Sequence, residues 1–530
     1  MNITLYDTTL RDGAQQEGLS LSVDDKLKIM CLLDEMGIDL IEGGWPGSNP
    51  KDAVFFERAK DLHLRHSRLS AFGCTRRADR VVEDDPNLQS LLAAETPVVA
   101  VFGKSWRLHV DRVLATTGEE NLRMICDTVR FLRESGREVV FDAEHFFDGY
   151  RDDAAYAVET LLAAVDGGAS VLVLCDTNGG AMPWDVSAAM ADVLQHIEVP
   201  LGIHAHDDGG LAVANSLTAV QAGATHIQGT VNGYGERCGN ADLCSVLPTL
   251  ALKLGRGCFA AGRLQQLTHL SESVSEIVNR RPNSQRPYVG QSAFAHKGGM
   301  HVDALMKCAE SYQHVDPSRV GNRSRVVVSE LSGKANLREK AREFGLSLLG
   351  TGERDKTHQV LSQIKDLEHR GFQFEGAEAS VELLVRRTDS EYTPPFELDD
   401  FHVLVQGHPE GGMRSEAAVK VVVGDQVAHT VADGNGPVNA LDAAVRKALI
   451  PIYPRISEVR LTDYKVRILD ADAGTAARTR VLITSSDGRT TWSTVGCGTN
   501  VIEASWLALA DALEYALVAS PIRQAQSIET

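Results

Sequence analysis

The first 265 residues alternate short β-branched segments with longer segments of helical character, and this alternation limits the possible folds more than any other feature of the chain. Spacings of roughly 25–40 residues leave room for one crossover helix between consecutive strands. We expect eight strands, at Ile3–Thr8, Leu40–Gly44, Leu69–Gly73, Val98–Gly103, Glu138–Glu144, Val171–Thr177, Leu201–His206 and His226–Asn232. Expected helices include Val23–Met36, Asn121–Ser135, Ala154–Gly167 and Leu211–Gly223. This count and domain size predict an α/β fold, a TIM (β/α)8 barrel.

The composition changes twice after the barrel, so we expect three domains in this chain of 530 residues. Residues 1–265 would form the barrel, and the more polar residues 266–395 a helical connecting subdomain. Residues 396–520 would form a C-terminal α+β domain with an internal repeat. One copy contains 418–423 and 434–444, and the other contains 465–469 and 495–505. Each copy predicts strands, a Gly-rich turn and a helix; two unrelated α+β hairpins are the alternative.

The composition also argues against several classes of protein. With 43% hydrophobic and 24% charged residues the chain is typical of a soluble globular protein, and no apolar stretch reaches the ~20 residues that a membrane span needs. A formal net charge of −19 argues against binding to nucleic acid or to an anionic membrane. The nine cysteines include no Cys-x-x-Cys motif, which favours reduced thiols in a cytoplasmic protein. Because the first residues look like a strand, we expect no signal peptide.

Three side chains at the ends of two expected strands have the chemistry of a metal site. In a strand, residues i and i+2 point to the same face, so His204 and His206 can bind one ion while Ala205 points away. Asp12 would supply an anionic third ligand. This set leaves about half of an octahedral ion's positions open, which suits a divalent metal that must also hold a substrate. Taken alone, the histidines could be hydrogen-bonded core residues, and Asp12 could be a helix cap.

Like these three, several other polar residues follow or end an expected strand. In a TIM barrel the chemistry takes place at the C-terminal ends of the strands. The candidates that follow or end an expected strand are Asp12, Glu42, Glu144, Thr177, His204, His206 and Asn240. Polar residues that served only the fold would be distributed over both ends of the barrel. We therefore predict an active site at one mouth.

Six segments spread over the chain resemble one protein family. They are Leu5–Gly18, Ile41–Pro50, His204–His206, Gly235–Asn240, Ala295–Ala304 and Asn500–Trp506. On these segments the chain resembles the α-isopropylmalate, homocitrate and citramalate synthases of the DRE-TIM metallolyase group. The run Glu-Gly-Gly-Trp-Pro-Gly-Ser-Asn-Pro within Ile41–Pro50 is similar to the (R)-citramalate branch, because isopropylmalate synthases usually carry a different segment after the glutamate.

The resemblance implies roles for residues at the mouth. Asp12, His204 and His206 would be ligands of a divalent metal, Mg, Mn or Zn, with Asn240 close by or acting through water. Arg11 and Thr177 would hold the oxygens of a 2-oxo acid, with Gln15 near them. Such an acid chelates a divalent ion through its ketone and carboxylate oxygens, and the metal and Arg11 then stabilise the alkoxide that forms. Glu42 would hold Arg11 or one of the metal ligands in position without binding the metal itself.

The reaction that the resemblance implies is a Claisen-type condensation of acetyl-CoA, the co-substrate, with pyruvate and water. The products would be (R)-citramalate and CoA, in isoleucine biosynthesis. By the resemblance Glu144 and His301 match the family's active-site glutamate and catalytic histidine, and Tyr312 is carried over with them; we assign acid and base work to the three jointly. Trp45 is expected near the acceptor pocket, where its bulk would limit the pocket's volume.

Three other functions compete with this one. A 2-isopropylmalate synthase would differ only in accepting the larger 2-oxoisovalerate. A metal-dependent carbon–carbon lyase could use the same barrel, although the long C-terminal repeat disfavours it. A non-catalytic amino-acid sensor built around that repeat would have little use for the arginine, aspartate and histidines at the mouth.

The C-terminal repeat is expected to be a regulatory and dimerisation domain, with isoleucine as the expected effector of a homodimer. Each copy places glycines, Gly434–Gly436 and Gly496–Gly498, directly before a helix. Glycines let backbone groups approach a small ligand closely, and a helix N-terminus attracts a carboxylate. A repeat that serves dimerisation alone is the alternative.

Overall fold

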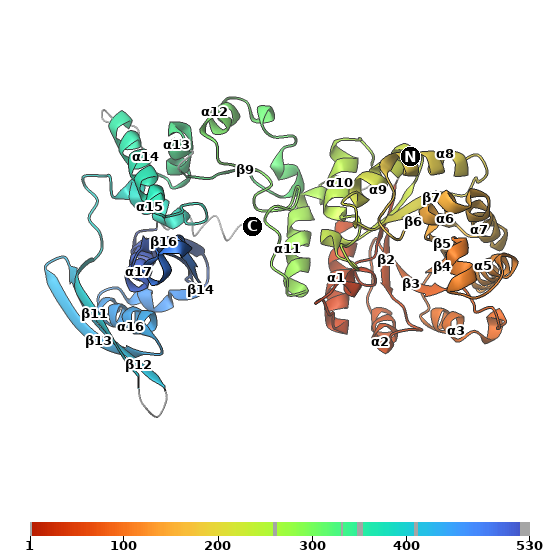
Figure 1. The fold of residues 1–530 in the computed structure, drawn as a ribbon, viewed down its shortest axis with the longest axis horizontal. Helices are drawn as coiled ribbons and strands as arrows, with labels where there is room; N and C mark the ends of the chain where they lie inside the picture. The colour runs from red at the N-terminus through yellow and green to blue at the C-terminus, as the bar shows by residue number, and fades with distance from the viewer. Residues whose placement is uncertain (1–2, 258–261, 330–331, 347–352, 408–411, 520–530) are drawn as a thin grey trace. The chain divides into compact units, whose positions relative to one another are not determined.

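The computed structural model describes residues 3–257, 262–329, 332–346, 353–407 and 412–519 (Figure 1). Contacts between residues divide the chain into two compact units. The first contains Met1–Phe294 and Val315–Ser324, and the second contains Ala295–His314 and Arg325–Thr530. Residue 520, where we expected the C-terminal domain to end, lies outside the described residues.

The first unit is built on a closed barrel of eight parallel strands in chain order, which confirms the predicted TIM barrel (Figure 1). The strands are β1 (Thr4–Asp7), β2 (Leu40–Gly44), β3 (Arg68–Cys74), β4 (Val98–Lys104), β5 (Glu138–Glu144), β6 (Val171–Asp176), β7 (Leu201–Ala205) and β8 (His226–Gly229). Pairing of β1 with β8 closes the ring. The last strand is shorter than predicted, because Asn232 has φ 63° and the chain turns away over Val231–Gly233.

Helices connect the strands and cover the outside of the barrel. The main ones are α1 (Val23–Met36), α2 (Pro50–Ala59), α3 (Pro86–Ala93), α5 (Gly118–Glu134), α7 (Ala154–Gly167), α8 (Pro183–Val193), α9 (Ala212–Gln221) and α10 (Leu243–Leu252). Local sequence fixes their ends, as in α1, where Ser22 and Asp25 form a capping box. This helix stops at Gly37, whose φ of 87° favours glycine. Two short helices, α4 (Arg107–Arg112) and α6 (Phe146–Asp152), follow β4 and β5 directly.

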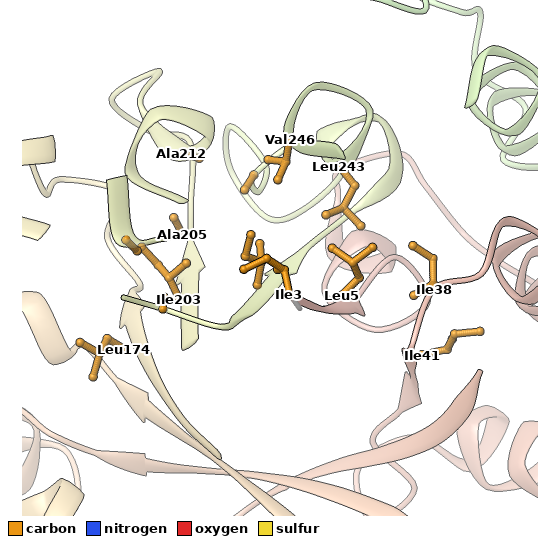
Figure 2. Packing of buried hydrophobic residues seen from close by; sticks show 14 of the residues in the cluster. Ile3, Leu5, Ile38, Ile41, Leu174, Ile203, Ala205, Ala212, Leu243 and Val246 are labelled. Atoms are coloured by element: carbon orange, nitrogen blue, oxygen red, sulfur yellow. The ribbon is translucent and has the colours of Figure 1, made fainter. Parts of the chain in front are cut away.

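Strand alternation sorts the side chains of the barrel into two layers. The outer layer fills the space between strands and helices, and Figure 2 shows Leu5 and Ile203 in this layer together with Leu243 and Val246 of α10. The inner layer fills the barrel itself and contains Tyr6, Leu40, Phe72, Val98, Ala100, Val140, Val173 and Cys175. Apolar side chains therefore fill the lower interior, and the polar ones gather toward the mouth.

Part of the expected connecting subdomain belongs to the barrel unit. Helix α11 (Leu267–Ile277) packs against α1, and Asn232 bonds to the Ser271 carbonyl and the Ser275 hydroxyl. Thr268 donates to the carbonyl of Val320, which brings Pro317–Val320 to the same unit. The expected boundaries at 265 and 395 remain predictions, since residues 266–294 are grouped with the barrel and residues 325–395 with the C-terminal strands.

The second unit begins with helices and ends with two copies of one arrangement. Its first part contains a two-stranded sheet of β9 (Ala295–His296) and β10 (Arg325–Val326), with α12 (Gly299–Lys307), α13 (Lys334–Glu343), α14 (Glu353–His369) and α15 (Glu378–Arg386). One copy then contains β11 (Glu397–Gly407), β12 (Met413–Val423), β13 (Gln426–Gly434) and α16 (Pro437–Leu449). The other contains β14 (Arg460–Ile468), β15 (Thr479–Ser486), β16 (Thr491–Gly498) and α17 (Val501–Val518).

Both copies of the predicted repeat therefore form three antiparallel strands followed by a helix. Their helices share one core, in which Leu441 and Val445 of α16 cluster with Leu509 and Leu513 of α17. No helix within the described ranges is both long and apolar enough to cross a membrane.

Candidate active site

Asp12, His204 and His206 lie together inside the mouth of the barrel. Asp12 occupies the turn after β1, immediately before the 3-10 turn Gly13–Gln15. His204 is on β7 and His206 follows that strand, while Ala205 between them joins the outer apolar layer. All three polar side chains are buried. The i, i+2 argument from the sequence thus describes the arrangement of the two histidines.

The distances between these side chains suit one small ion. Their ligand atoms all lie within 4.8 Å of one another. The Nε2 atoms of His204 and His206 are 3.3 Å apart, and Asp12 Oδ2 lies 3.6 and 3.8 Å from them. Two nitrogens at ~2.1 Å from a metal and at right angles to each other would be separated by about 3.0 Å. The described geometry is therefore close to that of adjacent ligands on one ion.

Electrostatics keeps the three groups in the protonation states that a cation needs. Burial, together with the neighbouring His206, lowers the pKa of His204 to about 3. Burial also lowers the pKa of His206. For Asp12 burial acts in the opposite direction, but Arg11 and the two imidazoles hold its pKa well below the usual range. Two neutral imidazoles and one carboxylate therefore face one another at neutral pH.

Asn240 adds an unused acceptor to this cluster. Its Nδ2 donates to Asp12 Oδ1 at 2.8 Å, and its backbone bridges to His206 across the mouth. Its side-chain Oδ1 is buried and has no hydrogen-bond partner among the described residues. A buried oxygen without a partner is costly, and a cation would satisfy it. The donor set as a whole fits a divalent metal.

Arg11 is held beside the cluster by two acids and an aromatic ring. Its Nε donates to Glu42 Oε2 at 2.6 Å and its Nη1 to Asp12 Oδ2 at 3.0 Å. The guanidinium carbon lies 3.8 Å from the centre of the Phe72 ring. Glu42 also accepts from the Tyr6 hydroxyl at 2.8 Å, so it is bonded from two sides. Burial raises the pKa of Glu42, whereas Arg11 lowers it. These contacts use two of the five N–H groups of a guanidinium.

The remaining mouth candidates lie on the loops and strand ends around the mouth. Thr177 follows β6, and its hydroxyl accepts the backbone N–H of His145 at 2.8 Å. His145 has φ 58°, a backbone conformation that non-glycine residues seldom adopt. Glu144 ends β5 and forms an ion pair with Lys104 of β4. Gln15 is exposed in the turn after Asp12.

Trp45 packs within an aromatic group at the mouth. Its ring meets Phe72 and Phe102 edge-on, with centroids 5.7 and 5.6 Å apart. Two bonds fix its position, since its Nε1 donates to Asn87 Oδ1 at 2.7 Å and its backbone N–H donates to Asp52 Oδ2 at 2.9 Å. Phe72 is also the ring beneath the Arg11 guanidinium.

His301 and Tyr312 form a pair in the second compact unit. His301 lies on α12, and Tyr312 follows a 3-10 turn at Ala309–Ser311. Their rings stack with centroids 4.4 Å apart and planes 26° apart. Both side chains are exposed, and the structure therefore brings together the two residues that the resemblance took from this part of the chain.

Two further polar residues, not predicted from the sequence, lie on the inner face of the barrel. Asp142 is two positions before Glu144 on β5, and Gln228 is two positions after His226 on β8. Both are buried, and Gln228 links Asp142 to the His204 ring. Strand alternation could have placed both side chains inside the barrel. Burial, together with the negative charge of Glu42, raises the pKa of Asp142 to about 8.

Arg237 was also missed, and it ties together three loops at the mouth. It has φ 57° and lies in the loop after β8. Its guanidinium donates to both carboxylate oxygens of Asp208 at 2.8 and 2.9 Å, and to the carbonyl of Thr177 at 2.7 Å. Its place in the segment Gly235–Asn240 was the available signal.

Three known families match successive parts of the chain. A family described as HMGL-like matches residues 2–274, one described as homocitrate synthase post-HMGL domain-like matches residues 288–371, and one described as LeuA allosteric (dimerisation) domain matches residues 375–517.

Individual relatives match along almost the whole length. The chain is 50% identical to an (R)-citramalate synthase of Geobacter sulfurreducens over 97% of both chains. It is 49% identical to an (R)-citramalate synthase of Aquifex aeolicus over 97% of this chain and 98% of the relative. Identity falls to 30% for a probable 2-isopropylmalate synthase of Methanopyrus kandleri, over 95% of this chain and 96% of the relative.

Proposed function

The chain belongs to the HMGL-like family and, within it, groups with the (R)-citramalate synthases, and from this membership we propose that it condenses acetyl-CoA with pyruvate and water to give (R)-citramalate and CoA. The observation that carries the proposal is the full-length identity of 50% to such a synthase. The buried cluster of Asp12, His204 and His206 supports it, because the chemistry needs a site that can polarise a ketone.

The acceptor would lie above this cluster. Asp12, His204 and His206, with Asn240 beside them, would hold a divalent cation, Mg, Mn or Zn, which acts as a Lewis acid on the acceptor's ketone. Arg11 donates N–H groups to the acceptor's oxygens and to the alkoxide that develops from the ketone. Glu42 and Asp12 already hold the Arg11 guanidinium in position, so this side chain needs little reorganisation when the negative charge forms on the acceptor.

Other mouth residues would complete acceptor binding. The Thr177 hydroxyl keeps its own proton for donation, because it accepts rather than donates in its bond with the His145 N–H. Gln15 is exposed in the turn after Asp12, where it can reach an acceptor. Gln15 lies in the turn that follows Asp12, and Thr177 follows β6, the strand next to the one that carries His204.

Proton transfer would be shared by Glu144, His301 and Tyr312. One group removes a methyl proton from acetyl-CoA, and the resulting enolate attacks the acceptor's ketone carbon. A group of this set then assists the water that cleaves the thioester. The ion pair with Lys104 holds the Glu144 side chain in position, and the stacked rings of His301 and Tyr312 support their acting as a pair.

Pyruvate, the smallest 2-oxo acid with a carbon side chain, is the acceptor we propose. The group of Trp45, Phe72 and Phe102 would form the wall against its methyl group. Trp45 is bonded to Asn87 and Asp52, so this wall cannot easily move away from a larger side chain. A 2-isopropylmalate synthase, the second candidate, is favoured less because its relative shares only 30% identity.

The match of residues 375–517 to an allosteric dimerisation domain supports regulation by an amino acid and assembly as a homodimer. We propose isoleucine as the effector, the end product of the pathway that citramalate would feed. The eight described cysteines are all free thiols, which fits a cytoplasmic enzyme; Cys258 lies outside the described residues.

The structure gives the glycines before the two helices a packing role. A Cβ added to Gly434 would lie 2.3 Å from the backbone nitrogen of Ala440, and one added to Gly496 would lie 2.0 Å from the carbonyl oxygen of Ala504. These glycines thus let α16 and α17 approach their strands. Gly436, in contrast, has open space around it and directly precedes α16.

The proposed function is tested by measuring thiol release from acetyl-CoA with a panel of 2-oxo acids. Pyruvate should give the highest kcat/KM. One methylene is worth only ~1–3 kcal/mol in an apolar pocket, so weak activity with 2-oxobutyrate is expected. Faster use of 2-oxoisovalerate than of pyruvate would identify the chain as an isopropylmalate synthase instead.

A further inference from the structure

Gln228 connects one metal-ligand candidate, His204 of β7, to a buried acid on β5. Its Oε1 lies 2.9 Å from His204 Nδ1, and its Nε2 lies 2.9 Å from Asp142 Oδ1. All three side chains are buried on the inner face, on β8, β7 and β5. The three groups therefore form one hydrogen-bonded line from Asp142 to the metal cluster.

The two contacts of the Gln228 amide determine which hydrogen-bonding group faces His204. Gln228 Nε2 donates to Asp142 Oδ1, and a carboxyl oxygen can accept such a bond in either protonation state. The amide NH2 of Gln228 thus faces Asp142, and its carbonyl oxygen faces His204. A carbonyl oxygen can only accept, so Nδ1 of His204 carries the ring's hydrogen.

This choice determines what His204 offers to the metal cluster. A neutral imidazole carries one hydrogen, so with Nδ1 protonated the Nε2 atom has a lone pair. Nε2 is the atom that lies 3.6 Å from Asp12 Oδ2 and 3.3 Å from His206 Nε2. His206 differs, because its buried Nδ1 has no hydrogen-bond partner among the described residues. Within the described site, the tautomer of only one of the two histidines is fixed in this way.

We propose that Gln228 is a positioning residue that holds His204 in the tautomer able to bind a metal, and that Asp142 orients the Gln228 amide for this task. The inference rests on the metal site of the proposed function. Groups behind a metal-binding histidine typically change metal affinity by 10–100-fold when they are removed. Gln228 should therefore act on metal affinity and should leave the bound metal's chemistry largely unchanged.

The test is a titration of metal-free, full-length protein with Mn²⁺, followed by electron paramagnetic resonance without substrates. Gln228→Leu removes the acceptor at similar volume and should raise the Kd by about 10–100-fold. Gln228→Glu retains an acceptor for His204 Nδ1 and should keep the Kd within about fivefold of the parent. His226→Gln is the matched control, because His226 lies on the same strand and face but has no bond to the cluster.

Turnover provides a second measurement that separates positioning from general damage. At saturating Mn²⁺ the kcat of Gln228→Leu should return to within about threefold of the parent, since the side chain does not touch a substrate. Circular dichroism checks that each variant is folded. Should Gln228→Leu fail to fold, the Gln228→Glu and parent proteins still decide the matter, because a Kd raised more than tenfold by Gln228→Glu would contradict the role of the acceptor.

Several results would overturn the inference. Gln228→Leu could bind Mn²⁺ as tightly as the parent, or His226→Gln could weaken binding as much as Gln228→Leu does. In either case Gln228 has no specific role, while the metal site and the proposed function stand. If the parent itself binds no Mn²⁺ and needs no metal for turnover, both the inference and the metal part of the proposed function are wrong.

Discussion

Charge at the barrel mouth is balanced by a small number of buried residues. Arg11 faces the carboxylates of Asp12 and Glu42, and each of these acids has a second bond, to Asn240 and to Tyr6. Removing one member of such a network leaves a buried charge without its partner, which costs more than the bond itself contributes. Effects at single residues should therefore be large and specific.

Substitutions of Asp12 and of His301 should impair the enzyme in different ways. Asp12→Asn should abolish turnover and metal retention while the fold persists, because Asp12 lies at the mouth and outside the apolar interior. His301→Ala should keep the metal, since His301 lies on α12 in the second unit, and should lower kcat by about 10²–10⁴-fold as expected for loss of an acid or base. Metal content by mass spectrometry and CoA release distinguish the two. Loss of metal in His301→Ala would contradict its assignment.

Asp7 should make the stability of the barrel depend on pH. Burial raises its pKa to about 7, although bonds from Thr9 oppose the rise. Between about pH 4 and 7 the folded chain binds a proton that the unfolded chain has released, so the free energy of unfolding falls as pH increases. Asp7→Asn should reduce this fall between pH 5 and pH 7 by about 2 kcal/mol in urea titrations. Asp24→Asn, at an exposed carboxylate, is the control, and an unchanged slope in Asp7→Asn would refute the prediction.

Loops and strand ends determine how the mouth of the barrel is assembled. Arg237 joins the loops after β6, β7 and β8 through Thr177 and Asp208. The strand and helix positions follow from the hydrophobic pattern, so most elements of the barrel could be predicted. The end of β8 could not, because the turn at Asn232 depends on bonds to Ser271 and Ser275 of α11, far along the chain.

The candidate site could be predicted only in part for the same reason. Motifs and strand ends indicated Asp12, His204 and His206. Strand alternation places Gln228 inside the barrel but does not indicate its bond to Asp142, which joins residues 86 positions apart and exists only in a closed barrel. Side-chain contacts across a barrel depend on strand register, which the sequence pattern of one strand does not contain.

Arg237→Gln should loosen the mouth without unfolding the barrel. Its ion pair with Asp208 is partly exposed, so the effect on Tm should be small. Displacement of the Thr177 loop should lower kcat/KM for pyruvate by about 10–100-fold, since small misplacements of binding groups are costly. Arg58→Gln, which breaks an exposed ion pair with Asp24 on the outer surface, is the matched control. Equal activity of the two variants would show that the three-loop contact has no catalytic importance.

Regulation by the C-terminal domain can be tested by removing that domain from the molecule. Ser380 and Arg387, on and just after α15, bond to Asp511 of α17, so the regulatory part must be removed from before α15. A chain ending at residue 371 should lose inhibition by isoleucine, whereas the intact enzyme should be inhibited with a coupling of about 1–3 kcal/mol. Leucine and valine serve as matched ligands, and circular dichroism checks the fold of the shortened chain. An intact enzyme that ignores all three amino acids, or a shortened one that is inhibited equally, would exclude this domain as the regulator.

The ligand atoms of the proposed metal site come from distant parts of the chain, since Asp12 and Asn240 are separated by 228 positions and meet only when β8 pairs with β1. A ribosome adding about 5–20 residues per second needs roughly 11–46 s to make the intervening segment. For most of that time the nascent polypeptide contains Asp12 without either histidine, because His204 and His206 follow it by 192 and 194 positions. The protein is therefore synthesised in an order that postpones metal capture until the barrel that will use the metal can close.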